Sequence, residues 1–164
     1  MGNFPFLTAS PPYSSMNDKK AIYEACLANI EKRIQAIQEA LDAAIAAGNE
    51  ETKSSAGDKY ETGRAMMQME QDKHRSQLAK AQHLKTELLH INLGKKYDTV
   101  EKGALVRTDS GLYFISTGIG KIMVGSEVCY AISMDAPLAK ALFGKKKNKV
   151  VVFQDKKYRV LDIG

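Results

Sequence analysis

Four carboxylates lie in or beside one short polar stretch, residues 48–58, near the end of the first third of the chain. Glu50 and Glu51 lie inside this stretch, Asp58 closes it, and Glu61 follows it. Carboxylate oxygens carry negative charge and are ligands that hard cations prefer. Acids in the first turn of a helix also have a purely structural role, because they favour the helix dipole. The chemistry therefore depends on the elements that position these acids.

The residues before the polar stretch have the pattern of a long helix. From Met16 to Ala47, apolar residues recur at alternating spacings of four and three, as in the seam of a coiled coil. These positions are Tyr23, Leu27, Ile30, Ile34, Ile37, Leu41 and Ala44. Asn17 or Asp18 is suited to cap the start of this helix, and Gly48 to end it in the left-handed region.

The residues after the stretch, from Asp58 to Asn92, are again typical of a helix. Ser55 with Asp58, and Asp58 with Glu61, both have the spacing of a capping box. The apolar pattern is less regular here, and Gln71 and His74 replace expected aliphatic residues. The remaining apolar positions include Met66, Met67, Met69, Leu78, Ala81, Leu84, Leu88, Leu89 and Ile91.

Two long helices joined by a short loop run antiparallel. The sequence therefore predicts a helical hairpin, a coiled coil over residues 16–94, whose tip is at about residues 48–58. Three histidines, His74, His83 and His90, are nine and seven residues apart, so they do not have the spacing of a metal site on one helix face.

The period changes after residue 95 to that of short strands separated by turns. Expected strands are 104–108, 111–116, 121–124, 127–132, 150–153 and 158–163. Pro137 to Phe143 is expected to form a short helix, with Asp135 as its cap and Gly144 after its end. Residues 95–164 are thus predicted to form a small antiparallel sheet with one short helix, which makes the chain an α+β protein.

The composition sets broad limits on function. The chain has 164 residues and a net charge of +5, with two groups of basic residues near its end, 145–149 and 156–159. Solvated loops and strand edges are the commoner role of such groups. Two distant cysteines, Cys26 and Cys129, form neither a disulfide framework nor a metal spacing, and a reducing cytoplasm is expected. Residues 1–15 are interpreted as a flexible leader, and no membrane span is expected.

The segment from Ile132 to Lys145 resembles the C-terminal domain of the Gre transcript-cleavage factors of bacterial RNA polymerase. The family has Ile-Ser, a spacer, Ser-Pro-Leu, Ala-Leu and Gly-Lys in this order, and here Ala136 replaces the serine before Pro137. Lys147-Asn148 replaces the family's Gly-Asp. The final two strands and the helical hairpin also match the family's layout. The resemblance covers about residues 17–164.

This resemblance implies an FKBP-like fold for residues 95–164 and docking at the rim of the polymerase secondary channel. Asp135, Pro137, Leu138 and Lys145 are then the docking residues. The hairpin would bring its tip acids, Glu50, Glu51, Asp58 and Glu61, into the polymerase active site.

In the family, the tip acids help to hold a second Mg²⁺ for hydrolysis of backtracked RNA. Here Glu51 keeps the first acidic position and Ser54 replaces the second. Glu51 and Asp58 are the candidate ligands of this shared Mg²⁺. No cofactor is expected to bind stably to the chain, and no catalysis is expected without the polymerase. The expected partners are RNA polymerase and the 3′ end of nascent RNA, and the expected state is a monomer without membrane contact.

Three other functions fit the sequence. The first is a regulator that occupies the channel without stimulating cleavage, as Ser54 suggests. The second is a coiled-coil scaffold without chemistry. The third is a peptide-binding or prolyl-isomerase domain, which would need an aromatic-lined pocket. The aromatic residues available for it are Tyr113, Phe114, Tyr130, Phe143, Phe153 and Tyr158.

Overall fold

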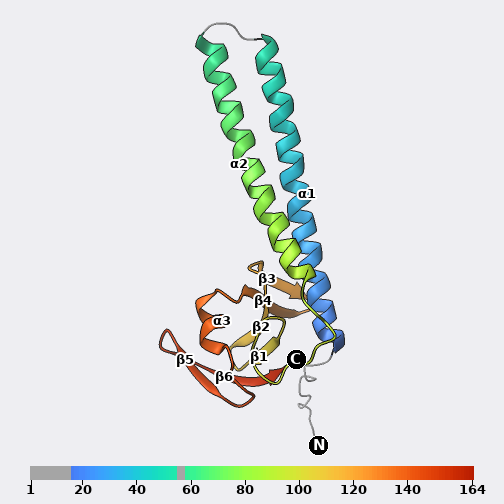
Figure 1. Ribbon diagram of the computed structural model, residues 1–164, viewed down its shortest axis with the longest axis vertical. Coiled ribbons are helices and arrows are strands. Elements are labelled where there is room, and N and C mark those ends of the chain that lie inside the picture. Colours follow the sequence, from blue (N-terminus) through green and yellow to red (C-terminus); the bar gives the residue numbers. More distant parts are fainter. Residues whose placement is uncertain (1–15, 55–57) are drawn as a thin grey trace, which may run out of the picture. The chain divides into compact units, whose positions relative to one another are not determined.

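The computed structural model describes residues 16–54 and 58–164, so the expected leader, residues 1–15, lies outside the described residues (Figure 1). Two long helices precede a six-stranded mixed sheet with one short helix, which is the predicted α+β class. The elements are α1 (Met16–Ser54), α2 (Asp58–Leu89), β1 (Leu105–Thr108), β2 (Gly111–Ser116), β3 (Gly120–Val124), β4 (Glu127–Ser133), α3 (Pro137–Leu142), β5 (Val150–Phe153) and β6 (Lys156–Ile163). Among the described residues, no helix is both long enough and apolar enough to span a membrane.

The chain forms two compact units. One unit is Ala28–Thr86, which comprises most of the two long helices. The other combines the chain up to Leu27 with Glu87–Gly164, and it contains the sheet, α3 and the first turns of α1.

In the helical unit, α1 and α2 pack as the predicted antiparallel hairpin. The predicted α1 seam is confirmed, since Ile30, Leu41 and Ala44 are buried and Ile34 and Ile37 are half-buried. Lys85 Nζ lies 3.2 Å from Glu31 Oε2 across the two helices. The α2 seam is less complete: Met66 and Met69 are 61% and 72% exposed, so the interpretation of these two residues as packing residues is wrong.

The first helix does not end at Gly48, as the sequence predicted, but continues to Ser54. Glu50, Glu51 and Lys53 favour helix and extend the Ala-rich stretch before them. Gly48 instead permits close packing, because a Cβ atom built there would lie 3.0 Å from Gln71 Nε2 and 3.6 Å from Met67 Cβ. The predicted caps Asn17 and Asp18 are likewise wrong, since α1 already begins at Met16.

The sheet has the strand order β3-β4-β2-β1-β6-β5. The prediction of a purely antiparallel sheet is wrong in one pair: β2 and β4 are parallel, with Leu112 opposite Cys129 and Ser116 opposite Ser133. Strand β2 is buried along almost its whole length, so both its edges need a partner. Because β4 takes the edge beside β2, β3 is displaced to the outside of β4.

One glycine in the sheet unit has a defined packing role. Gly103 has φ of 99°, and a Cβ atom there would lie 2.3 Å from Tyr97 Oη. Its N–H donates to Ile115 O at 2.6 Å, so the turn before β1 is held against β2. The ring of Tyr97 is 7% exposed and belongs to the main core of this unit with Val100, Ile115 and Leu142.

The first turns of α1 pack within the same unit. Ile22 is 3% exposed, and Cys26 and Cys129 are fully buried. Burial raises the pKa of the Cys26 thiol to about 12, and burial together with the nearby Cys26 does the same to the pKa of Cys129. Both cysteines are free thiols, as expected from their spacing.

Lys19 is a buried cation at the start of α1, with an exposed fraction of 3%. Its Nζ atom donates to Gly164 O at 3.3 Å and lies 4.5 Å from the centre of the Tyr97 ring. Burial still dominates, and it lowers the pKa of Lys19 to about 8 from 10.5. Holding this charged group in the core therefore costs stability at neutral pH.

We expect Lys19 to raise the free energy of unfolding between about pH 7 and 9. In this range the unfolded chain keeps the Lys19 proton that the folded chain loses, so the Lys19 contribution to stability increases with pH. The two buried thiols act in the opposite direction from about pH 8, because the unfolded state then loses thiol protons that the folded state retains. Urea unfolding of the natural chain and of Lys19→Met at pH 7, 8 and 9 separates the two effects, since the difference between their slopes is due to Lys19. An unchanged slope in Lys19→Met would contradict the assignment.

Candidate functional surfaces at the hairpin end and around α3

The acids of the predicted tip flank the connection between the two helices. Glu50 and Glu51 lie in the last turns of α1, and Asp58 and Glu61 lie in the first turn of α2. Glu50 and Glu61 are exposed, whereas the side chains of Glu51 and Asp58 lie outside the described residues. The prediction that Glu50 and Glu51 belong to a loop is therefore wrong, because α1 extends past both of them.

The position of these acids has an energetic consequence. Glu61 faces the favourable, positive end of the α2 dipole, whereas Glu50 lies near the negative end of α1. Helix-end chemistry therefore explains Glu61 but not Glu50.

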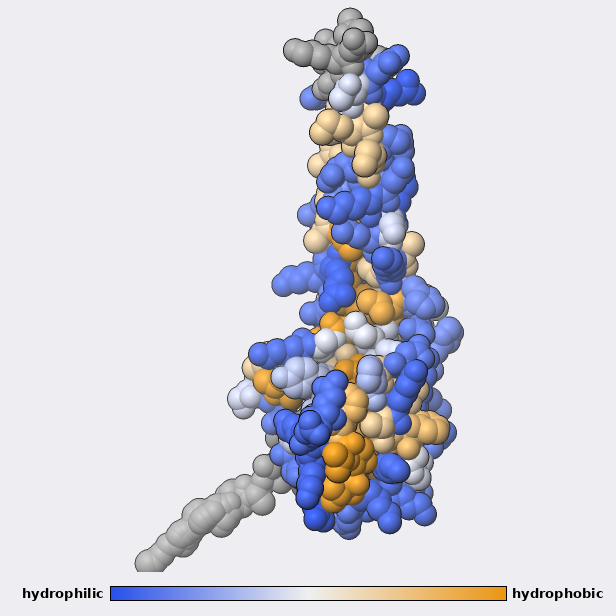
Figure 2. Space-filling view, turned by 90° about the vertical axis from the view of Figure 1, so that its left-hand side faces the viewer, coloured by the Kyte–Doolittle hydropathy of each residue, from blue (hydrophilic) through white to orange (hydrophobic). Residues whose placement is uncertain are grey.

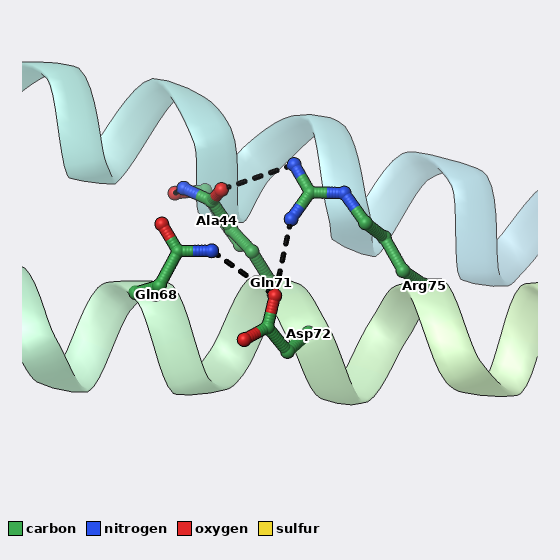
Figure 3. Close-up of polar contacts among 5 residues, drawn as sticks. All are labelled: Ala44, Gln68, Gln71, Asp72 and Arg75. Atoms are coloured by element: carbon green, nitrogen blue, oxygen red, sulfur yellow. Dashed lines mark hydrogen bonds and ion pairs between the residues drawn. The ribbon is translucent and has the colours of Figure 1, made fainter.

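A polar network supports this end of the hairpin (Figure 3). Gln71 Nε2 donates to the backbone oxygen of Ala44 at 3.4 Å, which links α2 to α1. Arg75 donates to Gln71 Oε1 at 3.2 Å and to Asp72 Oδ1 at 3.4 Å, and Gln68 Nε2 donates to Asp72 Oδ1 at 3.0 Å. Gln71 thus replaces an aliphatic seam residue with a cross-helix hydrogen bond, which the sequence pattern did not reveal.

A polar cavity of about 260 Å³ lies beside this network. Two arginines, Arg64 and Arg75, line it together with Asn49, Gln68 and Gln71. The donors of Arg75, Gln68 and Gln71 already bond within the network, whereas Arg64 is an exposed cation at the edge of the cavity. Sequence reasoning missed Arg64 and Arg75 because isolated arginines on an exposed helix face give no pattern.

The three histidines lie apart, two along α2 and His90 directly after its end. His74 Nε2 lies 3.0 Å from Glu70 Oε1, one turn away on α2, and its Nδ1 is buried without a hydrogen-bond partner. His83 and His90 are exposed. Among the side chains that the structure describes, those of residues 18–50 and 61–164, no three acidic, histidine or cysteine groups gather as they would around a metal ion.

The predicted docking segment surrounds the short helix α3. Asp135, Pro137 and Lys145 are exposed, and Leu138 is half-buried against the core of the sheet unit. Asp135 is not the helix cap that the sequence predicted: the N-cap is Ala136, without a side-chain hydrogen bond. Pro137 occupies the first turn and needs no hydrogen bond there, and the N–H of Asp135 instead donates to Ser133 Oγ at 3.0 Å.

The aromatic residues of the sheet unit are mainly part of its core. Tyr113, Phe114 and Tyr158 are at most 8% exposed. Tyr113 stacks on Tyr130 at 5.8 Å and meets the edge of Tyr158 at 6.4 Å. These contacts use the aromatic rings for packing, which disfavours the prolyl-isomerase hypothesis.

Comparisons with known proteins give one structural likeness to report. No protein-family model matches the chain, and no curated protein matches it. A solved structure entitled "Structure of the transcription factor Gfh1" is similar with 18% sequence identity and a TM-score of 0.36. The match covers 88% of this chain and 94% of that chain. At this identity and TM-score, the likeness assigns neither a family nor a function.

Proposed function

We propose that this protein is a Gre-like transcription factor that binds RNA polymerase and acts through the secondary channel of that enzyme. The observation that carries this proposal is the placement of acids at both helix ends that flank the hairpin connection. Glu50 and Glu51 end α1, and Asp58 and Glu61 begin α2. The resemblance of residues 132–145 to the Gre docking segment supports the same function.

The dimensions of the hairpin suit entry into a narrow pore. A helix with its side chains is about 10–12 Å wide, so two packed helices are much narrower than a globular domain. The part of α1 in the helical unit, residues 28–54, is ~40 Å long at 1.5 Å per residue. The hairpin can therefore carry carboxylates where a compact domain cannot enter.

The donor set at the hairpin end fits a Mg²⁺ ion shared with the polymerase. All four side chains offer carboxylate oxygen, which hard cations prefer, and Glu51 and Asp58 are the proposed ligands. When bound, the ion would activate water and stabilise charge on the phosphate. The chain itself supplies negative oxygen ligands and orients water, so we propose no stand-alone catalysis. Arg64, an exposed residue that lines the polar cavity, is suited to contact the 3′ end of the nascent RNA.

Ser54 supports a second candidate function. A hydroxyl does not carry the charge that recruits a cation, and this residue stands where the Gre family has its second acid. A regulator that fills the channel and changes initiation or pausing, without cleavage, would use the same hairpin and the same docking segment. The two candidates differ only in whether backtracked RNA is cut.

A shortened hairpin tests the proposal. Deleting residues 34–40 and 75–81 removes one heptad from each helix and shortens the hairpin by about 10 Å. Ala44 then keeps its partner Gln71, and Glu31 keeps Lys85, so the packing register is maintained. We expect the shortened protein to bind core RNA polymerase in a pull-down but to lose its effect on transcription. Failure of the full-length chain to bind the polymerase would overturn the proposal.

The docking segment yields a separate prediction. We expect Asp135→Lys to weaken polymerase binding by about tenfold, because reversing an exposed interfacial charge costs on the order of 1 kcal/mol or more. Asp98→Lys is the matched control, since Asp98 is also an exposed acid of the sheet unit but lies outside the docking segment. Surface plasmon resonance with immobilised core polymerase measures both. Equal loss in the two variants would indicate a non-specific charge effect.

A further inference from the structure

The last two strands of the sheet have an outer face and an open edge that the proposed function does not use. Strand β5 is the terminal strand of the sheet and pairs only with β6. Its residues alternate: Val151 is buried in the core, whereas Val150 and Val152 are 46% and 65% exposed. On β6, Lys157 and Arg159 lie opposite these two valines.

The hydrogen-bond register determines which backbone groups of β5 face outward. Val160 N donates to Lys149 O at 2.9 Å, which makes these residues a hydrogen-bonded pair. Because such pairs alternate along an antiparallel ladder, Val151 with Tyr158 and Phe153 with Lys156 are also hydrogen-bonded pairs. The N–H and C=O groups of Val150 and Val152 therefore point away from β6, toward the open edge.

The turn between β5 and β6 is short. Gln154 and Asp155 have φ of 50° and 62°, which is the two-residue hairpin turn that matches the twist of the strands. The sequence predicted a longer turn that included Lys156 and Lys157, but both residues belong to β6. As a result, β6 carries basic side chains along its paired length.

The charge of this region is strongly positive. Residues 145–162 contain seven Lys and Arg and two Asp, and this net charge of +5 equals that of the whole chain. Lys147 Nζ lies 4.0 Å from Asp162 Oδ1, so one of the two acids is already near a lysine. Figure 2 shows apolar atoms gathered where Figure 1 places β5, with hydrophilic side chains beside them.

We propose that the open edge of β5 binds an extended acidic segment of a partner protein as an added strand. Two outward N–H and two outward C=O groups supply the main-chain hydrogen bonds, as in other cases of strand addition. Alternate apolar side chains of the partner would continue the inner face beside Val151 and Phe153. The intervening acids would lie on the outer face beside Val150 and Val152, two strands from Lys157 and Arg159, toward which long acidic and basic side chains can extend.

The positive charge beside this edge favours an acidic protein segment over a second copy of the chain. Basic residues beside an edge strand prevent pairing with a second copy of the same chain, because like charges would then be brought together. They do not oppose an acidic strand. A nucleic acid is less suited, because it would leave the outward backbone N–H and C=O groups of β5 without partners.

Binding of a designed peptide to the full-length chain tests this inference. The probe is a labelled eight-residue peptide that alternates valine and glutamate, and fluorescence anisotropy reports its binding. We expect binding that weakens with salt, and at least about tenfold weaker binding of a peptide with lysine in place of glutamate. A peptide of the same composition with all valines at one end should also bind weakly, since only alternation matches the two faces of the strand.

Two variants of the chain separate the contribution of main-chain hydrogen bonds to peptide binding from the contribution of charge. Val152→Pro removes one outward N–H without removing a β5–β6 hydrogen bond, and Val152→Ala is its control with the N–H retained. We expect Val152→Pro to weaken binding about tenfold relative to Val152→Ala. Arg159→Glu, at an exposed position, should weaken binding of the acidic peptide and strengthen binding of the lysine peptide. Circular dichroism checks the fold of each variant.

Three outcomes would overturn the inference. The first is equal binding of the acidic and the basic peptide. The second is tighter binding of a single-stranded oligonucleotide that displaces the peptide. The third is concentration-dependent self-association of the chain that Val152→Pro abolishes, because the occupant of the edge would then be a second copy.

Discussion

Replacing the four acids of the hairpin end with their amides should reduce RNA cleavage in stalled elongation complexes by at least about tenfold. This is the loss typical of groups that support a metal site. The variant combines Glu50→Gln, Glu51→Gln, Asp58→Asn and Glu61→Gln, which keeps side-chain size and removes all four charges. Because Gln and Asn are tolerated at helix ends, the hairpin should still fold.

The control for this prediction is Glu39→Gln with Asp42→Asn. These are exposed acids of the same helix, each held by a glutamine one turn earlier, and they lie away from the helix end. The control variant should stimulate RNA cleavage as strongly as the natural chain does. The control variant and the fourfold variant should bind core polymerase equally. If the natural chain itself does not stimulate cleavage but still alters initiation, the non-cleaving function suggested by Ser54 applies. Cleavage that persists in the fourfold variant would remove the acids from the mechanism.

Gly103→Ala should lower the free energy of unfolding by about 3 kcal/mol. Two causes add. A residue with a side chain at φ of 99° is strained, which costs of order 1–3 kcal/mol, and the new Cβ would lie 2.3 Å from Tyr97 Oη. Overpacking of a filled core costs a further 1–3 kcal/mol, roughly. Chemical denaturation followed by circular dichroism measures the change.

Gly120→Ala separates the two causes. Gly120 has nearly the same φ, 98°, but no atom lies within 4 Å of a Cβ built there. Gly120→Ala should therefore lower the free energy of unfolding only by the cost of backbone strain, which is less than the full loss expected for Gly103→Ala. Equal losses in the two variants would show that the Tyr97 contact contributes nothing, and the packing role of Gly103 would then be wrong.

The sequence predicted the elements of this fold better than their pairing. Alternation, short apolar runs and turn residues located every strand to within two residues, because these are local signals. The parallel pairing of β2 with β4 depends on which edges of β2 remain open once the sheet assembles. No local pattern in Leu112–Ser116 or Cys129–Ser133 carries that information.

The hairpin end shows the same difference between local and tertiary causes. Gly48 has the local features of a helix stop, yet α1 continues through it, because the helix-forming residues after it extend the helix and its missing Cβ permits the close approach of Gln71. Once α1 reaches Ser54, Glu50 and Glu51 move from a predicted loop onto a helix. The identity of the acidic residues and their approximate position along the chain were therefore predictable. The secondary structure on which Glu50 and Glu51 lie was not. The outward backbone groups of β5 were also hidden, since they follow from the pairing register alone.

The two buried thiols have a practical consequence for tests of this protein. Cys26 and Cys129 are the only cysteines of the chain, and both are inaccessible and protonated well above neutral pH. Maleimide reagents attack exposed thiolates, so they should spare both residues in the native protein. A single Glu50→Cys substitution would therefore create one addressable attachment point. A photocrosslinker or fluorophore placed there would report directly what surrounds this position when the protein meets its partner.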